Sequence, residues 1–289
     1  MKKISIVRSL FNLDRRIIYL FIFLSILLPF LVKFDLPIKA AKNVRNVYDK
    51  IEDVAKTKGE RGTILLSFDF DNASRAELEP MAKAIIAHIF KKNIRLVVMG
   101  HWLNGVELTK TLLNEMSAEF KKKYGDNYVY LGYRPGVQIL IVNMGKDFKS
   151  AFQTDSQGKS TNDFLVTKNI KTLSDFDYVI SFSAGSGGIE EWVVYGQSKF
   201  HFTMAGACTA VMAADYFPFL QSGQLNGLIG GLAGAAQYEA LVGRPGSGID
   251  GMRPQSMAHI VLIIFILLGN IYYLTDKYLK NKKQDGGVH

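Results

Sequence analysis

The chain carries one long apolar run near each end, and this pairing limits its fold more than any other feature. The first run extends from Ile17 to Val32, and the second extends from about Met257 to Leu274. Each run is close to the roughly 17–25 apolar residues that cross a bilayer as a helix. We therefore expect two transmembrane helices on either side of a water-exposed middle region.

Both runs have an alternative interpretation. The first could be the core of a signal peptide that is cleaved after Ala40, although this site lies far from the apolar residues. The second could be a buried core helix, but Tyr272, Tyr273 and several lysines follow it. Aromatic residues and then lysines are typical of the cytoplasmic boundary of a span, which favours the membrane interpretation.

The positions of Lys and Arg predict the orientation of the chain. Positive charges flank the first run on both sides, whereas only Arg244 and Arg253 shortly precede the second run and a lysine cluster follows it. We therefore place both termini in the cytoplasm and the middle region outside, at a bacterial inner membrane. The net charge is +9. Since much of the excess lies beside the runs, membrane lipid explains it better than nucleic acid, for which we expect no binding.

Between the two runs, short apolar segments alternate with segments of helical periodicity. The expected strands are Thr63–Phe70, Ile94–Gly100, 128–133, Val137–Gly145, Asp177–Gly185 and Phe200–Ala207. This alternation predicts a mostly parallel sheet with right-handed crossovers. We expect an α/β fold, Rossmann-like or flavodoxin-like, with about five or six strands and with its ligand sites at the carboxyl ends of these strands.

These patterns predict the organisation of the whole chain. It comprises a cytoplasmic N-terminus (1–16), a transmembrane helix (17–34), an amphipathic linker helix (35–60), a Rossmann-like α/β domain (61–212), a glycine-faced helix and loop (213–256), a second transmembrane helix (257–275) and a basic cytoplasmic tail (276–289).

Two carboxylates, Asp69 and Asp71, follow the first expected strand and precede a helix. Over about eight residues this pattern resembles the first motif of haloacid-dehalogenase-type phosphatases. The resemblance implies that Asp69 is a nucleophile, that Asp71 is an acid/base and that Mg²⁺ is the cofactor. The chain departs from the motif at Ala73, and the second strand ends in Met-Gly-His rather than Ser or Thr. The alternative is that both carboxylates accept hydrogen bonds from loop and helix-start amides.

A glycine-rich loop, Ser183–Gly188, joins an expected strand to a helix. Its amides could hold a small anion such as a phosphate or a carboxylate, which makes weak ligand-binding candidates of Ser183, Gly185, Ser186, Gly187 and Gly188. The loop matches neither the Walker motif nor the dinucleotide-binding motif. Glu190 and Glu191 follow at once and would repel an anion, so a plain tight turn is the stronger interpretation.

The remaining reactive side chains give weaker signals. Cys208 is the single cysteine, and it is either a nucleophile that His101 or His201 could assist or a buried structural residue. No histidine has a companion at metal-ligand spacing, so we expect no metal site. Trp102, with Tyr133 and Arg134, could line a pocket at the sheet edge or present a surface to a partner.

The segment Tyr216–Val242 carries no charge from Phe217 to Tyr238. On a helix, its glycines would share a face about 100° wide: Gly223, Gly227, Gly230, Gly231 and Gly234. Small residues let helices approach closely, and Asn270 in the second apolar run could hydrogen-bond another helix. The glycine-faced helix could pack within its own domain, against a neighbouring subunit, against the bilayer, or as a third span.

Double anchoring, the glycine face and the incomplete catalytic motifs together favour one function. We expect a non-catalytic scaffold or binding subunit of an oligomeric envelope complex, without a cofactor, that contacts lipid, other copies of itself and other membrane proteins. The alternatives are a membrane-tethered hydrolase or phosphatase that uses Asp69 and Asp71 with Mg²⁺, and a sensor of small anionic ligands.

Overall fold

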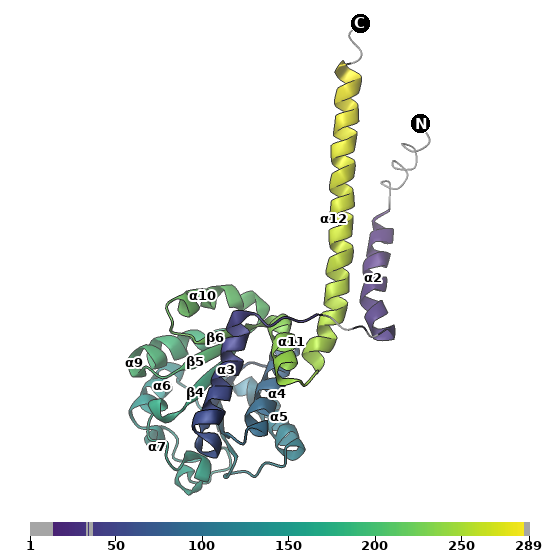
Figure 1. Cartoon of the computed structure of the whole chain (residues 1–289). Helices are drawn as coiled ribbons and strands as arrows, with labels where there is room; N and C mark the ends of the chain where they lie inside the picture. Colours follow the sequence, from purple (N-terminus) through teal and green to yellow (C-terminus); the bar gives the residue numbers. More distant parts are fainter. Residues whose placement is uncertain (1–13, 33, 35–36, 286–289) are drawn as a thin grey trace. The chain divides into compact units, whose positions relative to one another are not determined.

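The computed structural model describes residues 14–32, 34 and 37–285 (Figure 1). The chain divides into two compact units, of which one is Ile38–Ile249 and the other comprises the two ends of the chain. Of the predicted cytoplasmic N-terminus only residues 14–16 are described, and residues 286–289 of the predicted tail also lie outside the described part.

The larger unit is built on a six-stranded sheet with the order β3-β2-β1-β4-β5-β6. Every neighbouring pair of strands is parallel, which confirms the predicted α/β class. The order is that of the doubly wound dinucleotide-binding fold rather than that of flavodoxin. The strands are β1 (Thr63–Asp69), β2 (Arg95–Gly100), β3 (Tyr128–Tyr133), β4 (Tyr178–Ser183), β5 (Met204–Cys208) and β6 (Gly227–Gly230).

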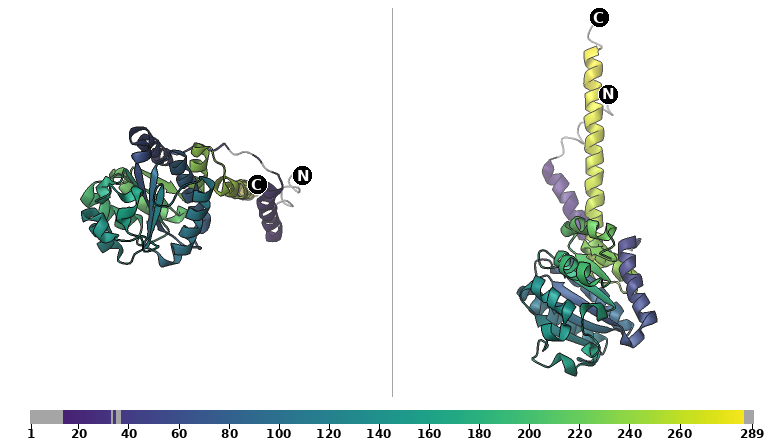
Figure 2. Two further views of the ribbon diagram at one scale, coloured as in Figure 1. Left: turned by 90° about the horizontal axis from the view of Figure 1, so that it is seen from below. Right: turned by 90° about the vertical axis from the view of Figure 1, so that its left-hand side faces the viewer.

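Helices cover both faces of this sheet (Figure 2). The helices that pack on one face are α3 (Lys42–Thr57), α4 (Arg75–Lys91), α5 (Val106–Glu119) and α11 (Gly231–Val242). The segments that pack on the other face are α6 (Val137–Lys146), α7 (Phe148–Ala151), α8 (Ile189–Glu191), the π-helical turn η6 (Trp192–Gln197) and α10 (Ala213–Gln221). The short helix α9 (Ser198–Phe200) follows η6.

The sequence of β1 explains its central position. All seven residues of the strand are buried, because a parallel strand covered on both faces needs a continuous apolar run rather than alternation. Ile64, Leu66 and Phe68 enter the core beneath α4, whereas Leu65 enters the core on the opposite face. Side chains two residues apart in a strand point to the same face, so Ser67 and Asp69 lie on the face of Leu65. They are the polar side chains near the carboxyl end of β1.

Two predictions for the domain are wrong. Val137–Gly145, which was predicted as a strand, forms the helix α6 instead, after a left-handed turn at Gly136 (φ 79°). The predicted continuous helix over Tyr216–Val242 is instead α10, then β6, then α11. A strand in the middle separates the glycines, so the predicted single glycine face does not form.

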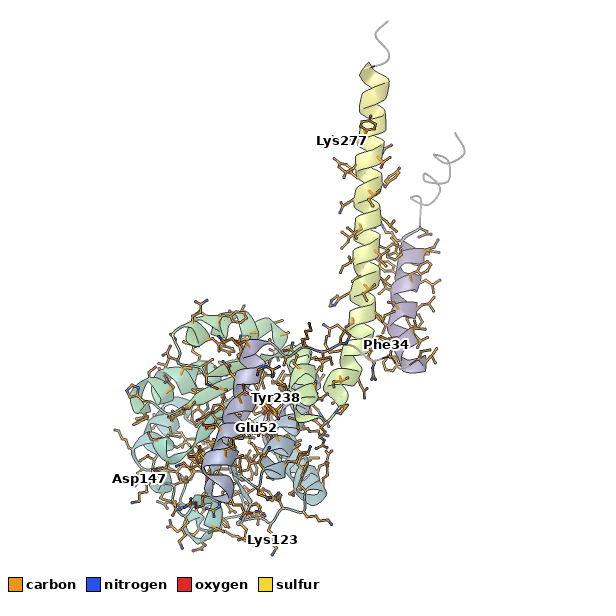
Figure 3. All side chains as sticks on the ribbon, viewed as in Figure 1. Phe34, Glu52, Lys123, Asp147, Tyr238 and Lys277 are labelled. Atoms are coloured by element: carbon orange, nitrogen blue, oxygen red, sulfur yellow. The ribbon has the colours of Figure 1, made fainter. Side chains whose placement is uncertain are left out.

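The predicted linker helix belongs to the domain. Its apolar residues Val44, Val47, Ile51 and Val54 are buried, and α3 lies against β6 and α11. The Asn46 side chain donates a 2.9 Å hydrogen bond to the carbonyl of Asn226, 180 residues later in the chain. Further along α3, the buried His88 ring lies 2.9 Å from Glu52 and 2.9 Å from Tyr238. Figure 3 labels Glu52 and Tyr238.

The smaller unit contains α2 (Arg15–Leu31) and most of α12 (Ser247–Asp285). Within the described part of the chain, Ser247–Tyr278 of α12 is the one helical stretch that is long and apolar enough to cross a membrane. The apolar helix α2 has 17 residues, which is below the roughly 20 that a span typically requires. The Phe21 ring of α2 and the Phe265 ring of α12 meet edge to face at 6.0 Å.

A buried carboxylate caps the start of α12. Glu239, on α11, is 3% exposed and accepts hydrogen bonds from the backbone amides of Gly246 (3.0 Å), Gly248 (2.9 Å) and Ile249 (2.8 Å). Gly248 and Ile249 belong to the first turn of α12 and Gly246 directly precedes it. Backbone donors at such a helix start lack intrahelical partners, and a negative charge is favourable there. Glu239 therefore holds the last residues of the larger unit, up to Ile249, against α11.

Candidate functional site

The strand order places a topological switch point between β1 and β4. The chain leaves β1 through α4 on one face of the sheet and leaves β4 through α8 on the other. Because the crossovers diverge, a crevice forms outside the carboxyl ends of these strands, and ligands of open α/β sheets bind there. Asp69 and Ser183 are paired residues at this point of β1 and β4.

Asp69 is fully buried at the carboxyl end of β1. Its carboxylate accepts a 2.7 Å hydrogen bond from the Ser67 hydroxyl and a 2.6 Å hydrogen bond from the backbone amide of His101. Burial raises the pKa of Asp69 to about 7, although these two hydrogen bonds act in the opposite direction. A carboxyl group in this environment is protonated over much of the acidic range.

His101 directly follows β2 and is 6% exposed. Neither ring nitrogen makes a well-formed hydrogen bond among the described residues. Burial lowers the pKa of His101 to about 4, while the neighbouring backbone of Arg134 opposes this effect. The imidazole is therefore neutral near pH 7, and its ring centroid lies 5.9 Å from that of Trp192.

Unpartnered buried polar atoms gather in this region. In the described part of the chain, five of the six such side-chain atoms are on β4, directly after β2 or β5, or in η6: His101 Nδ1 and Nε2, Ser181 Oγ, Trp192 Nε1 and Thr209 Oγ1. Each unsatisfied buried group costs about 1–3 kcal/mol. Native proteins rarely retain such groups outside functional sites or hydrated positions, so their concentration here marks a candidate site.

A cleft of about 480 Å³ opens at His101, and its volume lies in the range of small-molecule sites. It is lined by His101, Trp102, Gly136, Val137, Gln138, Ile139, Ser186, Gly187 and Glu191. The lining comes from the segments that follow β2, β3 and β4. The Trp102 indole donates a 3.0 Å hydrogen bond to the carbonyl of Ser186, which joins two of these segments across the cleft.

Another cleft, of about 360 Å³, lies at the β3 edge of the sheet and is lined in part by Lys110, Tyr124 and Lys159. Its buried polar group is satisfied, because the Tyr124 hydroxyl donates to Asp155 at 2.7 Å. None of the six unpartnered buried atoms lines it. The cleft beside His101 is therefore the stronger candidate.

The predicted anion loop contributes only part of its residues to the cleft. Ser186 and Gly187 line the cleft, whereas the Ser183 hydroxyl turns inward and donates a 2.7 Å hydrogen bond to the carbonyl of Gly185. Gly187 has a left-handed φ of 85°, as a tight turn requires. Glu191 also lines the cleft and brings a negative charge, which disfavours a purely anionic ligand there.

The predicted catalytic residues do not form a reactive set. The Asp71 carboxylate accepts a 3.0 Å hydrogen bond from the Ala73 amide, as the turn-capping alternative predicted. The described residues contain no group of three His, Cys, Asp or Glu side chains that could hold a metal ion. Cys208 is buried, and burial raises the pKa of its thiol to about 12. The thiol is therefore protonated rather than nucleophilic.

The predicted interface glycines occupy separate packing positions. Gly227 on β6 lies against α3, where a methyl group would meet the Asn43 carbonyl and the Val47 side chain. Gly230 and Gly231 adjoin Ala213 and Ala210, and Gly234 adjoins Ile229. Gly223 is in a left-handed turn with open space around it. Asn270 is exposed on α12.

Sequence reasoning named Asp69, Trp102 and part of the glycine loop, but it did not connect them with His101 and Glu191. One usable signal was that polar residues follow successive parallel strands, whose carboxyl ends share one edge of the sheet. Tyr133 and Arg134, which were predicted to line a pocket with Trp102, do not line this cleft.

Comparisons with protein-family models, with curated proteins and with solved structures give no match.

Proposed function

We propose that this chain is a membrane-anchored, non-catalytic binding subunit that holds a small molecule in the cleft beside His101. The observation that carries this proposal is a cleft that is lined by the segments after β2, β3 and β4 and by His101, whose two ring nitrogens are buried and unpartnered among the described residues. A pocket with a few convergent polar groups at this position is the usual form of a small-molecule site in such folds.

A binding role fits the side chains better than a catalytic one. Asp69 has no exposed surface and both of its carboxylate oxygens accept hydrogen bonds, so it has no access to a substrate as it lies. The thiol of Cys208 is buried and protonated. Activated nucleophiles need a neighbouring base and access to the substrate, and these residues lack that combination.

Membrane anchoring is proposed through both ends of the chain. In this proposal α12 is one span and α2 is the second, with Arg15 and Arg16, the first two residues of α2, reaching the interface while the apolar residues stay within the bilayer. Lysines follow the α12 span and favour a cytoplasmic C-terminus. Under this proposal both termini are cytoplasmic and the domain lies outside the inner membrane.

Intrinsic fluorescence provides a direct test, because the two tryptophans of the chain both lie at the candidate site. Trp102 lines the cleft and Trp192 lies against His101. The full chain in lipid nanodiscs would be titrated with amino acids, sugars, nucleotides, amines and carboxylates. We expect at least one class to change the emission saturably and Trp102→Phe to reduce that change. A flat response to every class would overturn the proposal.

A further inference from the structure

The cleft brings two opposite electrostatic features together. One is the amino-terminal end of α6, a helix of 10 residues whose first turn has no side-chain cap and no acidic residue. Residues Gly136–Ile139 at this end line the cleft. Backbone amides of a first helical turn have no intrahelical partners, and together with the helix dipole they favour a carboxylate or another anion.

The other feature is the carboxylate of Glu191, which lines the same cleft. The Glu191 side chain makes no hydrogen bond and no ion pair among the described residues. It is the one lining residue with a formal charge near pH 7, because the His101 imidazole is neutral there. An unpaired, half-buried carboxylate favours a ligand group that carries positive charge and donates hydrogen bonds.

His101 is a second, independent indication of a ligand at the α6 end. It is 6% exposed, it lines the cleft, and neither ring nitrogen makes a well-formed hydrogen bond among the described residues. A neutral imidazole can donate one hydrogen bond and accept another. The cleft therefore offers a donor, an acceptor, a set of amides and a carboxylate to one small molecule.

The lining also contains three large apolar side chains, in addition to the polar Gln138 and Ser186. Trp102 and Val137 are half-buried in the cleft wall, and Ile139 is 71% exposed at the first turn of α6. Exposed large apolar side chains next to a polar cleft favour a ligand that has an apolar portion of its own.

We propose that the cleft binds a small zwitterion, an α-amino acid with an apolar side chain, whose carboxylate meets the α6 amides and whose ammonium group meets Glu191. This inference rests on the proposed small-molecule function and specifies its ligand class. It replaces the anionic ligand that the glycine-rich loop predicted, because an anion alone would leave the Glu191 carboxylate unpaired and repelled.

Leucine and two fragments of it test this assignment on the full chain in nanodiscs. 3-Methylbutylamine lacks the carboxylate, and 4-methylpentanoate lacks the ammonium group. We expect leucine to raise the Tm by about 3–6 °C at ten times its dissociation constant. Since each charged contact is lost with its group, each fragment should bind roughly tenfold more weakly or worse. A fragment that binds as tightly as leucine would overturn the inference.

Variants at two neighbouring glutamates distinguish a direct contact between Glu191 and the ligand's ammonium group from a general effect of negative charge near the cleft. Glu191→Gln should weaken leucine binding about tenfold or more and should strengthen rather than weaken the binding of 4-methylpentanoate, because the repulsion between two carboxylates is removed. The matched control is Glu190→Gln, because Glu190 is exposed and does not line the cleft; it should leave both affinities unchanged. Equal leucine affinity in Glu191→Gln and the parent protein would contradict the assignment.

The failure of this inference differs from the failure of the proposed function. If a sugar, a nucleotide or a simple anion changes the tryptophan emission while leucine does not, the zwitterion assignment is wrong and the binding function stands. If no class of compound changes it, both are wrong. The fragment comparison uses only the parent chain, so it decides the matter even where a variant fails to fold.

Discussion

The backbone amide of His101 donates a 2.6 Å hydrogen bond to the carboxylate of Asp69. This contact joins the residue after β2 to the last residue of β1, at the edge of the sheet where the cleft opens. It also places a carboxyl group with a raised pKa beside an imidazole with a lowered pKa. The stability of the protein should therefore depend on pH through both residues, in opposite directions.

Asp69→Asn should remove the part of the pH dependence of stability that comes from the titration of Asp69. The folded pKa of about 7 lies above the ordinary value of 3.8, so between these values the unfolded chain has released a proton that the folded chain retains. Stability then falls as pH rises through this window, by up to about 4 kcal/mol. The asparagine variant keeps an acceptor for the His101 amide and lacks the titration. Denaturation curves of both proteins from pH 4 to 8 measure the difference, and parallel curves would refute it.

His101→Leu should act in the opposite sense. The folded pKa of about 4 lies below the ordinary value of 6.5, so the unfolded chain binds a proton first and the parent protein loses stability as pH falls below 6.5. The leucine variant avoids this loss and removes two unpartnered nitrogens. We expect it to exceed the parent by about 2 kcal/mol at pH 5, and by less at pH 7.5. A variant that is less stable at pH 5 would contradict this account.

Glu239→Ala should weaken the start of α12. The substitution leaves the amides of Gly246, Gly248 and Ile249 without their acceptor, and we expect a loss of about 2 kcal/mol by analogy with strong helix caps. Glu119→Ala is the matched control, since Glu119 forms a partly exposed ion pair with Arg244 that contributes less than about 1 kcal/mol. Thermal unfolding distinguishes the two, and equal losses would argue against the cap.

Two glycine substitutions test the packing of the C-terminal part of the domain. Gly227→Ala should cost about 1–3 kcal/mol, because the methyl group would meet the Asn43 carbonyl 2.5 Å away and Val47 2.7 Å away. Gly223→Ala meets no atom within 4 Å and should cost only about 1 kcal/mol for its left-handed backbone. Denaturant midpoints of both variants measure this. If Gly223→Ala were the more damaging, Gly223 would have a packing partner outside this domain.

The proposed topology predicts opposite labelling of two introduced cysteines. Lys168→Cys in the domain and Lys277→Cys near the end of the α12 span are both exposed positions. In spheroplasts, a membrane-impermeant maleimide should label the first and should label the second only after permeabilisation. The native Cys208 is buried and its thiol is protonated, so the background is low. Labelling of Lys277→Cys in intact spheroplasts would reverse the orientation.

The strands that sequence could predict are those with a long unbroken apolar run. β1 and β4 are buried throughout, and such a run admits few other structures when glycine or polar residues bound it. Val137–Gly145 has an equally apolar run, but periodicity cannot separate a buried strand from a buried helix there. In the structure the segment follows a left-handed turn at Gly136 and forms the helix α6.

β6 was beyond prediction because two of its four residues are glycines, which have low strand propensity. Contact with α3, far away in sequence, holds Gly227 in place. The candidate site was also beyond prediction, because contacts between distant parts of the chain form it. Asp69 stood out by type and position, but its pairing with the His101 amide, and the burial that shifts both pKa values, come from the tertiary structure.

The packing of α3 on β6 has a consequence for how the chain is made. The contact between Asn46 and Asn226 spans 180 residues, so α3 leaves the ribosome long before its binding surface exists. Contacts of such long range form late and slow folding. Until β6 is synthesised, the apolar side of α3 and the strands beneath it stay uncovered. Closure of the domain therefore coincides with the emergence of α12. Under the proposed topology, membrane insertion of that helix would compete in time with the last step of folding.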